Sequence, residues 1–396
     1  MNKAYVVGYG LIDALGNNPI DCFANMLNNA DYTKDVPSLT DENYKIHRAI
    51  QVDKSTINIL PDLPKVLTKL QLMAFHSTDQ ALKMAGLAHS KNVAVLYSTI
   101  LNDLETMDEL FSRVATNKRV SPRMVLNRIP DMLPSYISQY YQFMGASTAI
   151  YAACATGINT IDYAMRLLDE YDYVVVGSGD AGSFSFAMKS FHIMGAIGNV
   201  SCPFDINREG FVIGDGSGTL ILQSEKMVKK YNSKVYATLY PPGIANDAYD
   251  ATSPADDGRG AILAIEKALR DVDGPIHAVN AHATSTPAGD DVEYNVVTKQ
   301  FGAIPIYAPK AKIGHTMGGS GIVETIYAIE SMNAGMLPHI HNLKETNIDS
   351  LNCLVRTNTP LPTVDTLRTL NNSFGFGGKC ASQVIEVISP CNLTVI

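Results

Sequence analysis

The sequence has 396 residues, of which 46% are hydrophobic and 18% charged, and its formal net charge is −8. This length can bury one large core or two fused ones, and the negative charge argues against nucleic acid as the main partner. The six cysteines lack the spacing of a zinc site and favour a reducing compartment. No apolar run reaches the length of a membrane span and no leader-like segment opens the chain. We therefore expect a cytoplasmic protein that is not inserted in a membrane.

The first half of the chain alternates predicted strands and helices. Apolar runs predict strands at residues 4–7, 93–97 and 173–177, and apolar residues at helical spacing predict a helix at 67–85. Gly8-Tyr9-Gly10 is similar to a dinucleotide-binding fingerprint, but Asp13 takes the third glycine position and no helix follows directly. Residues 99–145 form an excursion with helical patterns, a usual place for a lid or a subunit contact. Residues 210–222 alternate glycine with apolar residues and predict a tight hairpin.

A strand, a cysteine and a helix follow one another near the middle of the chain. Residues 147–153 predict a buried strand, and apolar residues at helical spacing from Ile158 predict a helix as far as Glu170. Cys154 therefore lies in the turn between them, where the helix dipole and free backbone amides favour a thiolate. On this stretch alone, a buried structural cysteine is an equally good interpretation.

The alternation starts again at about residue 232, which divides the chain into halves 1–232 and 233–396. Strands are predicted at residues 235–240, 278–281 and 304–308, and helices at 260–272, 290–301 and 321–332. No repeat is visible at the level of residues. The duplication of a strand-and-helix half is therefore inferred from the pattern of elements alone.

Three stretches of the second half have the residue types of a reactive site. His282 follows a predicted strand beside three hydroxyl side chains, and Lys310 and His315 lead into a glycine-rich helix start. Residues 371–378 predict a turn whose backbone amides can converge on an anion. Taken singly, such a histidine is usually a hydrogen-bonded core or surface residue, and such a turn is usually only a turn.

Together with the cysteine, these stretches occur in the order and approximate spacing of one family. The matching runs are residues 6–10, 153–157, 203–216, the run at 282, the run at 310–315 and residues 373–378. On these motifs the chain resembles a β-ketoacyl-acyl carrier protein synthase of the type I/II class, a condensing enzyme of the thiolase superfamily. The resemblance implies an α/β, thiolase-like fold of five layers, αβαβα, built from two similar halves and usually found as a homodimer.

The resemblance also implies a role for each matching side chain. Cys154 would be the nucleophile that accepts an acyl chain from acyl carrier protein. His282 and His315 would donate hydrogen bonds to the malonyl thioester carbonyl as carbon dioxide leaves, and Lys310 and Glu324 would support the histidine pair. The reaction would be a decarboxylative Claisen condensation that elongates a fatty-acid or polyketide chain, with preorganised donors stabilising the enolate.

Further positions would bind the substrate. Thr284 and Thr286 would hold the pantetheine arm, and the backbone amides of the nucleophile and of Phe376 would form an oxyanion hole. Because Phe376 lies between two glycines, its ring is also predicted to be a mobile gate over the nucleophile. Ile100 is placed deeper in the acyl pocket. Phe374 is grouped with the substrate-binding residues, although a core aromatic is the preferred interpretation of its ring.

The expected partner is acyl carrier protein, loaded with an acyl or a malonyl group on its phosphopantetheine arm, and no metal or other cofactor is expected. Carrier proteins are acidic, as this chain is, so docking requires a local basic patch. Lys118 and Arg119 are the first candidates, because the resemblance places carrier contacts there. Further candidates are Lys65, Lys69 and Lys189, and for each residue an ordinary solvated loop is the alternative.

Departures from the family pattern concern the substrate more than the chemistry. Ala283 stands where the family usually has glycine, Ala311 where serine is common, and Lys379-Cys380 where Thr-Asn is common, and residues 194–201 look short. A degradative thiolase would have a second catalytic cysteine in a late glycine-rich motif, but the residues around Cys380 fit the synthase pattern.

Two alternatives stay open at this point. One is a type II polyketide or aryl-polyene ketosynthase, as a homodimer or paired with a related subunit. The other is a non-catalytic partner of the chain-length-factor kind, which would lack the nucleophile that this chain retains.

Overall fold

The structure is a computed structural model that describes residues 2–36, 45–64, 67–87, 90–102, 104–129 and 131–388. The strands are β1 (Ala4–Asp13), β2 (Lys34–Asp35), β3 (Arg48–Ala49), β4 (Val93–Ser98), β5 (Ser147–Thr148), β6 (Tyr173–Ala181), β7 (Asp215–Gln223), β8 (Ala237–Leu239), β9 (Gly243–Asn246), β10 (Ala278–Asn280), β11 (Ile306–Tyr307), β12 (Met336–Leu337), β13 (Thr359–Pro360), β14 (Thr366–Gly375) and β15 (Lys379–Ile388). The α-helices are α1 (Pro19–Met26), α2 (Lys69–Met84), α3 (Met107–Ala115), α4 (Pro122–Leu126), α5 (Met132–Tyr141), α6 (Thr156–Leu167), α7 (Ser185–Ile193), α8 (Glu225–Tyr231), α9 (Arg259–Leu269), α10 (Pro287–Phe301), α11 (Lys310–Ile313) and α12 (Ser320–Ala334). Short 3₁₀ helices are η2 (Lys54–Thr56), η3 (Leu104–Thr106) and η4 (Met317–Gly319).

The main sheet consists of one strand arrangement used twice. The first half has the order β1-β7-β6-β4-β5, and the second has the order β8-β15-β14-β10-β11, with β9 also paired to β15. In each half two antiparallel pairings are followed by two parallel pairings. β1 pairs with β8 from Ala4↔Leu239 to Val6↔Ala237, which joins the two halves edge to edge. The strand order thus repeats, as a fold of two similar halves requires.

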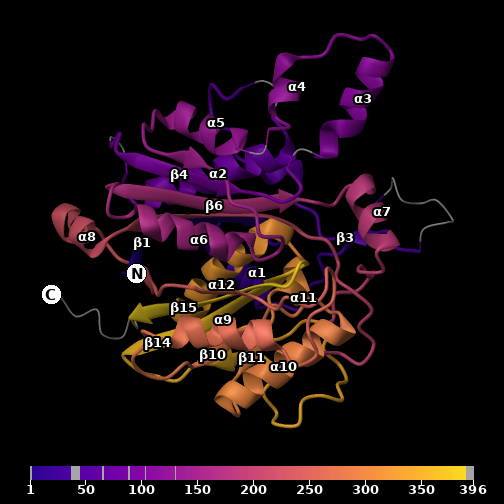
Figure 1. Cartoon of the computed structure of the whole chain (residues 1–396), viewed down its shortest axis with the longest axis vertical. Coiled ribbons are helices and arrows are strands. Elements are labelled where there is room, and N and C mark those ends of the chain that lie inside the picture. Colours follow the sequence, from indigo (N-terminus) through magenta and orange to yellow (C-terminus); the bar gives the residue numbers. More distant parts are fainter. Residues whose placement is uncertain are drawn as a thin grey trace.

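Helices separate the two half-sheets and cover their outer faces (Figure 1). α6 and α12 lie in the middle, where α12 packs against α6, against β7 of the first half and against β14 of the second. α2 and α5 cover the outer face of the first half-sheet, and α9 and α10 cover that of the second. This is the predicted αβαβα layering. Within the described ranges, no helix has the length and apolar character needed to cross a bilayer.

The glycines near the start of the chain serve the packing of α2 on β1. A Cβ at Gly8 would lie 2.3 Å from the carbonyl oxygen of Ala81, and one at Gly10 would lie 2.1 Å from that of Ser77. Only glycine allows the helix backbone to come this close to the strand. β1 continues through both glycines as far as Asp13, so they are part of a strand and not of a nucleotide-binding turn.

The two central helices cross at a second pair of glycines. A Cβ at Gly157 of α6 would come within 2.7 Å of a backbone nitrogen of α12, and one at Gly321 of α12 would come within 2.6 Å of a backbone nitrogen of α6. The two backbones are therefore in direct contact. Because Cys154 lies just before α6 and His315 lies shortly before α12, this crossing sets the distance between the two motifs.

Two predicted elements differ from the structure. The strand predicted at 147–153 is only two residues long in β5 and lies half-buried at the sheet edge. Beyond it, the amides of Ile150 and Ala152 donate to the side chains of Ser98 and Thr156 instead of to a neighbouring strand. The hairpin predicted at 210–222 is wrong, because residues 215–223 form one strand, β7, that pairs with both β1 and β6. Its alternating glycines leave room for the second half to pack: a Cβ at Gly218 would lie 3.0 Å from the Ile322 side chain of α12.

The close crossing of α6 and α12 predicts a penalty for one added methyl group. We expect Gly157→Ala and Gly321→Ala each to lower the free energy of unfolding by about 1–3 kcal/mol, because the new Cβ meets backbone atoms. Chemical denaturation measures the change. Glu266→Ala, at an exposed position of α9, is the control and should stay within about 0.5 kcal/mol of the parent. If both glycine variants are as stable as the control, the backbone contact is not as close as described.

Candidate active site

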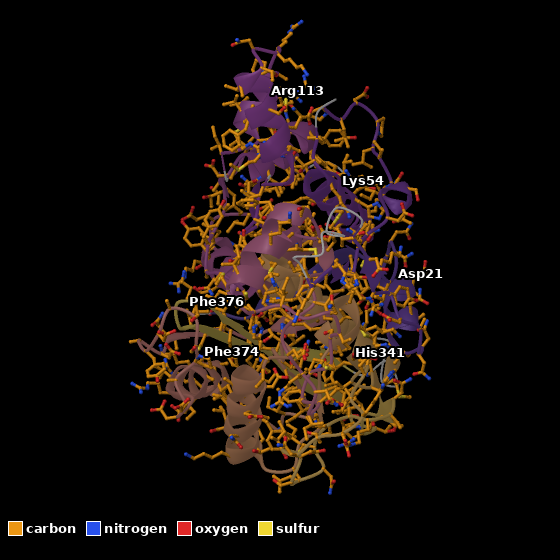
Figure 2. All side chains as sticks on the ribbon, turned by 90° about the vertical axis from the view of Figure 1, so that its right-hand side faces the viewer. Asp21, Lys54, Arg113, His341, Phe374 and Phe376 are labelled. Atoms are coloured by element: carbon orange, nitrogen blue, oxygen red, sulfur yellow. The ribbon has the colours of Figure 1, made fainter. Side chains whose placement is uncertain are left out.

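The predicted reactive residues meet in one cavity of about 450 Å³ that both halves of the chain line. Ile100, Ala153 and Cys154 come from the first half. The lining residues from the second half include His282, Thr284, Thr286, His315, Met317, Phe374 and Phe376. Figure 2 shows Phe374 and Phe376 on one side of the molecule, near the middle of its long axis.

Cys154 and His315, which both line this cavity, are in direct contact. The Nε2 atom of His315 lies 3.1 Å from the Cys154 Sγ atom. The backbone amide of Met317 donates to Nδ1 of His315 at 3.3 Å, and the Ser320 hydroxyl lies 3.0 Å from the same nitrogen. Since a backbone amide can only donate, Nδ1 is an acceptor and the ring hydrogen is on Nε2, directed toward the sulfur.

The thiol of Cys154 is held in its protonated form. Burial raises the pKa of this thiol to about 12, and the positive charge of Lys310 opposes the rise. The expectation that the helix start favours a thiolate is therefore wrong for the site as a whole, because removing the sulfur from water outweighs the helix dipole. A thiol in this state must lose its proton before its sulfur can act as a nucleophile.

His282 lies beside His315, with their ring centroids 5.5 Å apart and their planes nearly perpendicular. Burial and the charge of Lys310 lower the pKa of both histidines well below 6.5. Both rings are therefore neutral at physiological pH. The buried Nδ1 atom of His282 has no hydrogen-bond partner among the described residues.

Lys310 and Glu324 form a fully buried ion pair behind the histidines. The Lys310 Nζ atom lies 2.5 Å from the Glu324 Oε1 atom. Burial raises the pKa of the Glu324 carboxyl to about 7, and the charge of Lys310 opposes this rise. The positive charge of Lys310 next to two imidazoles disfavours their protonation.

The substrate-binding positions also face the cavity. The hydroxyls of Thr284 and Thr286 lie 3.2 Å apart, and Ile100 and the Phe374 ring line the wall. The Phe374 ring centroid is 5.8 Å from that of His282, so this aromatic packs beside a site residue.

Phe376 occupies a turn that is shorter than predicted. β14 continues to Gly375, so the turn comprises only residues 376–378. A Cβ at Gly375 would lie 2.8 Å from the Cys154 amide nitrogen, which places the next amide, that of Phe376, close to the nucleophile. The Gly377 amide donates to the Ala251 carbonyl at 2.8 Å, so this turn is held to the loop after β9.

The candidate docking residues do not share one surface. Lys118 and Arg119 are exposed between α3 and α4, which project from the body of the molecule (Figure 1). Lys69 is wrong as a docking residue, because it is buried and its Nζ lies 2.5 Å from an Asp215 carboxylate oxygen. Lys189 is half-buried on α7, just before the cavity-lining residues 194–196. Lys65 lies outside the described residues.

Sequence reasoning missed one carboxylate that shapes the site. Glu293 of α10 is buried and accepts the backbone amides of His282 and Ala283 at 2.8 Å each, and the Asn372 side chain donates to it at 3.0 Å. It thus fixes the turn after β10. A signal was present, because Glu293 lies on the same buried face of its helix as Val296 and Val297.

Comparison with known proteins assigns the family. The sequence model of the β-ketoacyl synthase N-terminal domain matches residues 1–227, and that of the C-terminal domain matches residues 236–344. The chain belongs to the β-ketoacyl synthase family. It is thus a condensing enzyme of the type I/II class, an acyltransferase of fatty-acid or polyketide synthesis.

Named relatives agree with this assignment. The chain is 34% identical over 293 residues to the mitochondrial 3-oxoacyl-[acyl-carrier-protein] synthase of Arabidopsis thaliana, a match that covers 68% of this chain and 63% of that relative. It is 33% identical over 289 residues to 3-oxoacyl-[acyl-carrier-protein] synthase 2 of Vibrio harveyi, covering 69% of each. It is 27% identical to 3-oxoacyl-[acyl-carrier-protein] synthase 1 of Escherichia coli, covering 98% of this chain and 99% of that one.

Solved structures share the fold. A type II polyketide ketosynthase in complex with its acyl-carrier protein superimposes with a TM-score of 0.86 at 21% identity, covering 98% of this chain and 100% of that one. A ketosynthase from Xenorhabdus doucetiae in complex with its chain length factor gives a TM-score of 0.80 at 23% identity, covering 98% of each. At these identities the likeness confirms the thiolase-like fold.

The neutral histidines can be tested by NMR. Because the pKa of each ring lies well below 6.5, we expect the ¹⁵N signals of His282 and His315 to stay unchanged from about pH 8 to about pH 6, where an ordinary histidine becomes mostly charged. The His315 shifts should be those of the Nε2–H tautomer. His282→Gln and His315→Gln assign the signals. Titration of either ring in this range would contradict the described environment.

The lowered pKa values of His282 and His315 also set the direction in which pH changes the stability of the fold. Below about pH 6.5 the unfolded chain takes up protons on these two residues that the folded chain does not, so their contribution to stability falls as the pH falls.

Proposed function

We propose that this protein is an elongating 3-oxoacyl-acyl carrier protein synthase. Its reaction joins an acyl chain held on Cys154 to a two-carbon unit derived from a malonyl group. The observation that carries this proposal is the cavity in which the Cys154 sulfur lies 3.1 Å from His315 Nε2, with His282 beside it. Both substrates arrive as thioesters on the phosphopantetheine arm of acyl carrier protein.

The first half-reaction is acyl transfer. The Cys154 sulfur attacks the thioester carbonyl of the incoming acyl group, a new carbon–sulfur bond forms, and the pantetheine thiol leaves with the proton that the cysteine gives up. The amides of Cys154 and Phe376 donate hydrogen bonds to the developing oxyanion. This assignment is supported by Gly375, which packs against the backbone of Cys154. Because the thiol is protonated at rest, the nucleophile forms only as the substrate binds.

The second half-reaction makes the carbon–carbon bond. Carbon dioxide leaves the malonyl group and its bonding electrons form an enolate, whose oxygen accepts hydrogen bonds from His282 and His315. The enolate carbon attacks the acyl carbonyl on Cys154, and the cysteine leaves as the thiolate, which takes up a proton. Neutral imidazoles suit this role, because each can donate a hydrogen bond without first losing a proton.

Other residues position the two substrates. The charge of Lys310, which Glu324 pairs with in the interior, favours neutral histidines. Thr284 and Thr286, which line the cavity, would hold the pantetheine arm. Phe376 lines the same cavity as Cys154, and its ring would act as a gate over the nucleophile. In this scheme the reaction uses the residues of the chain and the phosphopantetheine arm of the carrier, with no further cofactor.

We propose that a second copy, or a related subunit, pairs with the edge strand β5. This strand ends the sheet and is only half-buried, so its outer backbone groups are available to another strand. Large apolar side chains next to it are exposed, including Met144 at 77% and Tyr151 at 45%.

The five described cysteines are free thiols, which supports a reducing compartment such as the cytoplasm.

The pathway has two candidates. Relatives named 3-oxoacyl-acyl carrier protein synthase favour fatty-acid elongation. The similarity to polyketide ketosynthases that were solved with a carrier or with a chain length factor supports a type II polyketide or aryl-polyene ketosynthase as the second candidate. A non-catalytic partner is disfavoured, since Cys154 and both histidines are present and line one cavity.

Separate variants test the two half-reactions. Cys154→Ala should abolish condensation. His282→Ala and His315→Ala should still acquire an acyl group on the cysteine, while the rate of carbon dioxide release from malonyl-acyl carrier protein falls by about 100-fold or more, because an enolate donor is lost. Intact-mass spectrometry and carbon dioxide release are the readouts, and His339→Ala is the surface control. Normal product from the cysteine variant, or parental decarboxylation by a histidine variant, would remove the mechanism.

Charge reversal tests the docking surface. Residues 113–128 contain five basic side chains and no acidic one in a chain of net charge −8, and Lys118 and Arg119 are exposed within this stretch. Arg113 of the same stretch lies near one end of the molecule (Figure 2). We expect Lys118→Glu with Arg119→Glu to raise KM for acyl-acyl carrier protein by about five- to tenfold, with a small effect on an acyl-pantetheine substrate.

The control for docking is Lys226→Glu with Lys230→Glu on α8, which makes the same charge change on a different helix. Added salt should weaken carrier binding by the parent enzyme and have less effect on the Lys118 and Arg119 variant. Equal KM values for the two double variants would place the carrier elsewhere.

A further inference from the structure

One buried carboxylate beside the site has no place in the reaction described above. Asp180, near the end of β6, is fully buried and accepts four hydrogen bonds. Its Oδ1 atom accepts from the Thr99 hydroxyl and from the Leu101 amide at 3.0 Å. Its Oδ2 atom accepts from the Ile100 amide at 3.2 Å and from the Gly318 amide at 2.8 Å.

These donors belong to two segments with different tasks. Residues 99–101 begin the excursion that contains α3, α4 and α5, and Ile100 lines the acyl cavity. Gly318 belongs to η4, and the neighbouring Met317 amide is the donor that fixes the ring hydrogen of His315. One carboxylate therefore joins the wall of the pocket to the turn behind a reacting histidine.

The two segments also touch each other directly. A Cβ at Gly318 would lie 3.0 Å from Cγ2 of Ile100 and 3.0 Å from Oδ2 of Asp180. Each segment contains a non-glycine residue in the left-handed region, Asn102 with φ 48° and Met317 with φ 50°. Such a conformation persists only where the surroundings hold it, and the bonds of Asp180 hold the neighbours of both residues, Leu101 and Gly318.

The chemistry of the contacts requires an acceptor at both oxygens. All three backbone partners can only donate, so an amide in place of the carboxylate would turn its NH₂ group toward at least one N–H. Burial raises the pKa of Asp180 to about 6, and its hydrogen bonds oppose the rise, so the group is ionised at neutral pH. A buried carboxylate costs free energy that an apolar residue would not. Stability alone therefore does not explain its presence.

We propose that Asp180 is a positioning residue of the condensation site, which holds Ile100 in the wall of the acyl pocket and the Gly318 turn behind His315 in one fixed arrangement. The proposal rests on the function proposed above. It has two separable consequences, because three bonds hold residues 99–101 at the pocket wall while the fourth holds Gly318 in the turn next to His315. Loss of the bonds to residues 99–101 affects which acyl chains fit, and loss of the bond to Gly318 affects decarboxylation.

Three variants separate these consequences. Asp180→Asn disturbs the whole set of bonds, and Thr99→Val removes one donor on the side of the pocket wall while keeping the side-chain shape. Asp13→Asn is the matched control: Asp13 is also a buried carboxylate, bonded to the Leu15 amide at 2.8 Å and to the Tyr327 hydroxyl at 2.6 Å, and it does not line the cavity.

Two probes that need no carrier protein give the readouts. Acylation of Cys154 by acyl-CoA thioesters of short, medium and long straight chains is followed by intact mass, and decarboxylation of malonyl-pantetheine is followed by carbon dioxide release. We expect Asp180→Asn to lower kcat for decarboxylation by about 10- to 100-fold with KM within about twofold, as a misplaced catalytic group does. It should also change the longest chain accepted. Thr99→Val should change the chain profile and leave decarboxylation within about twofold of the parent.

Every result decides between positioning and simple stability. If Asp180→Asn and Thr99→Val lose thermal stability as Asp13→Asn does but keep the parental chain profile and decarboxylation rate, the positioning role is overturned. If Asp180→Asn does not fold, the chain profile of Thr99→Val decides alone. If Cys154 of the parent protein accepts no thioester at all, the proposed function fails and this proposal falls with it. That result differs from one in which the parent is acylated and the variants behave as the parent does, which overturns the positioning role alone.

Discussion

The contact of α6 with α12 at Gly157 and Gly321 is the constraint on which the site depends. Each helix follows a motif that the other half of the chain cannot supply, the cysteine before α6 and the histidine before α12. Because the backbones touch at the crossing, the nucleophile and His315 are brought within hydrogen-bond distance, at 3.1 Å between Sγ and Nε2. A duplicated fold thus becomes a single site only because its two central helices have no side chains at the point where they meet.

Removal of water then sets the protonation states in that site. Burial keeps the Cys154 thiol protonated and both imidazoles neutral, while the charge of Lys310 acts on all three. The same lysine needs Glu324 to be tolerated in the interior. The ion pair is therefore better understood as an electrostatic device than as a source of stability. It favours histidines that donate hydrogen bonds over histidines that act as acids, which suits stabilisation of an enolate.

The walls of the cavity tie the chemistry to the choice of substrate. Ile100 begins the excursion whose exposed basic stretch is the candidate surface for an acidic carrier. The turn with Phe376 is hydrogen-bonded to the loop after β9, so movement of the ring would involve that loop as well. Asp180 links the pocket wall to the turn behind His315. In the proposed reaction, chain length, access and decarboxylation would therefore depend on neighbouring segments of one cavity.

The sequence by itself predicted the alternation of strands and helices from local runs of residues. Its motifs, through the family resemblance, predicted the layered fold and the candidate site residues Cys154, His282 and His315. Only the tertiary structure decided which carboxylates are buried beside the site and which charged side chains pair with one another. Lys69 looked like a surface lysine but is paired in the interior with Asp215, a partner 146 residues away in the chain. The glycines of β7 looked like a hairpin but make room for a helix of the other half. Burial and long-range partners set these properties, and neither leaves a pattern in neighbouring residues.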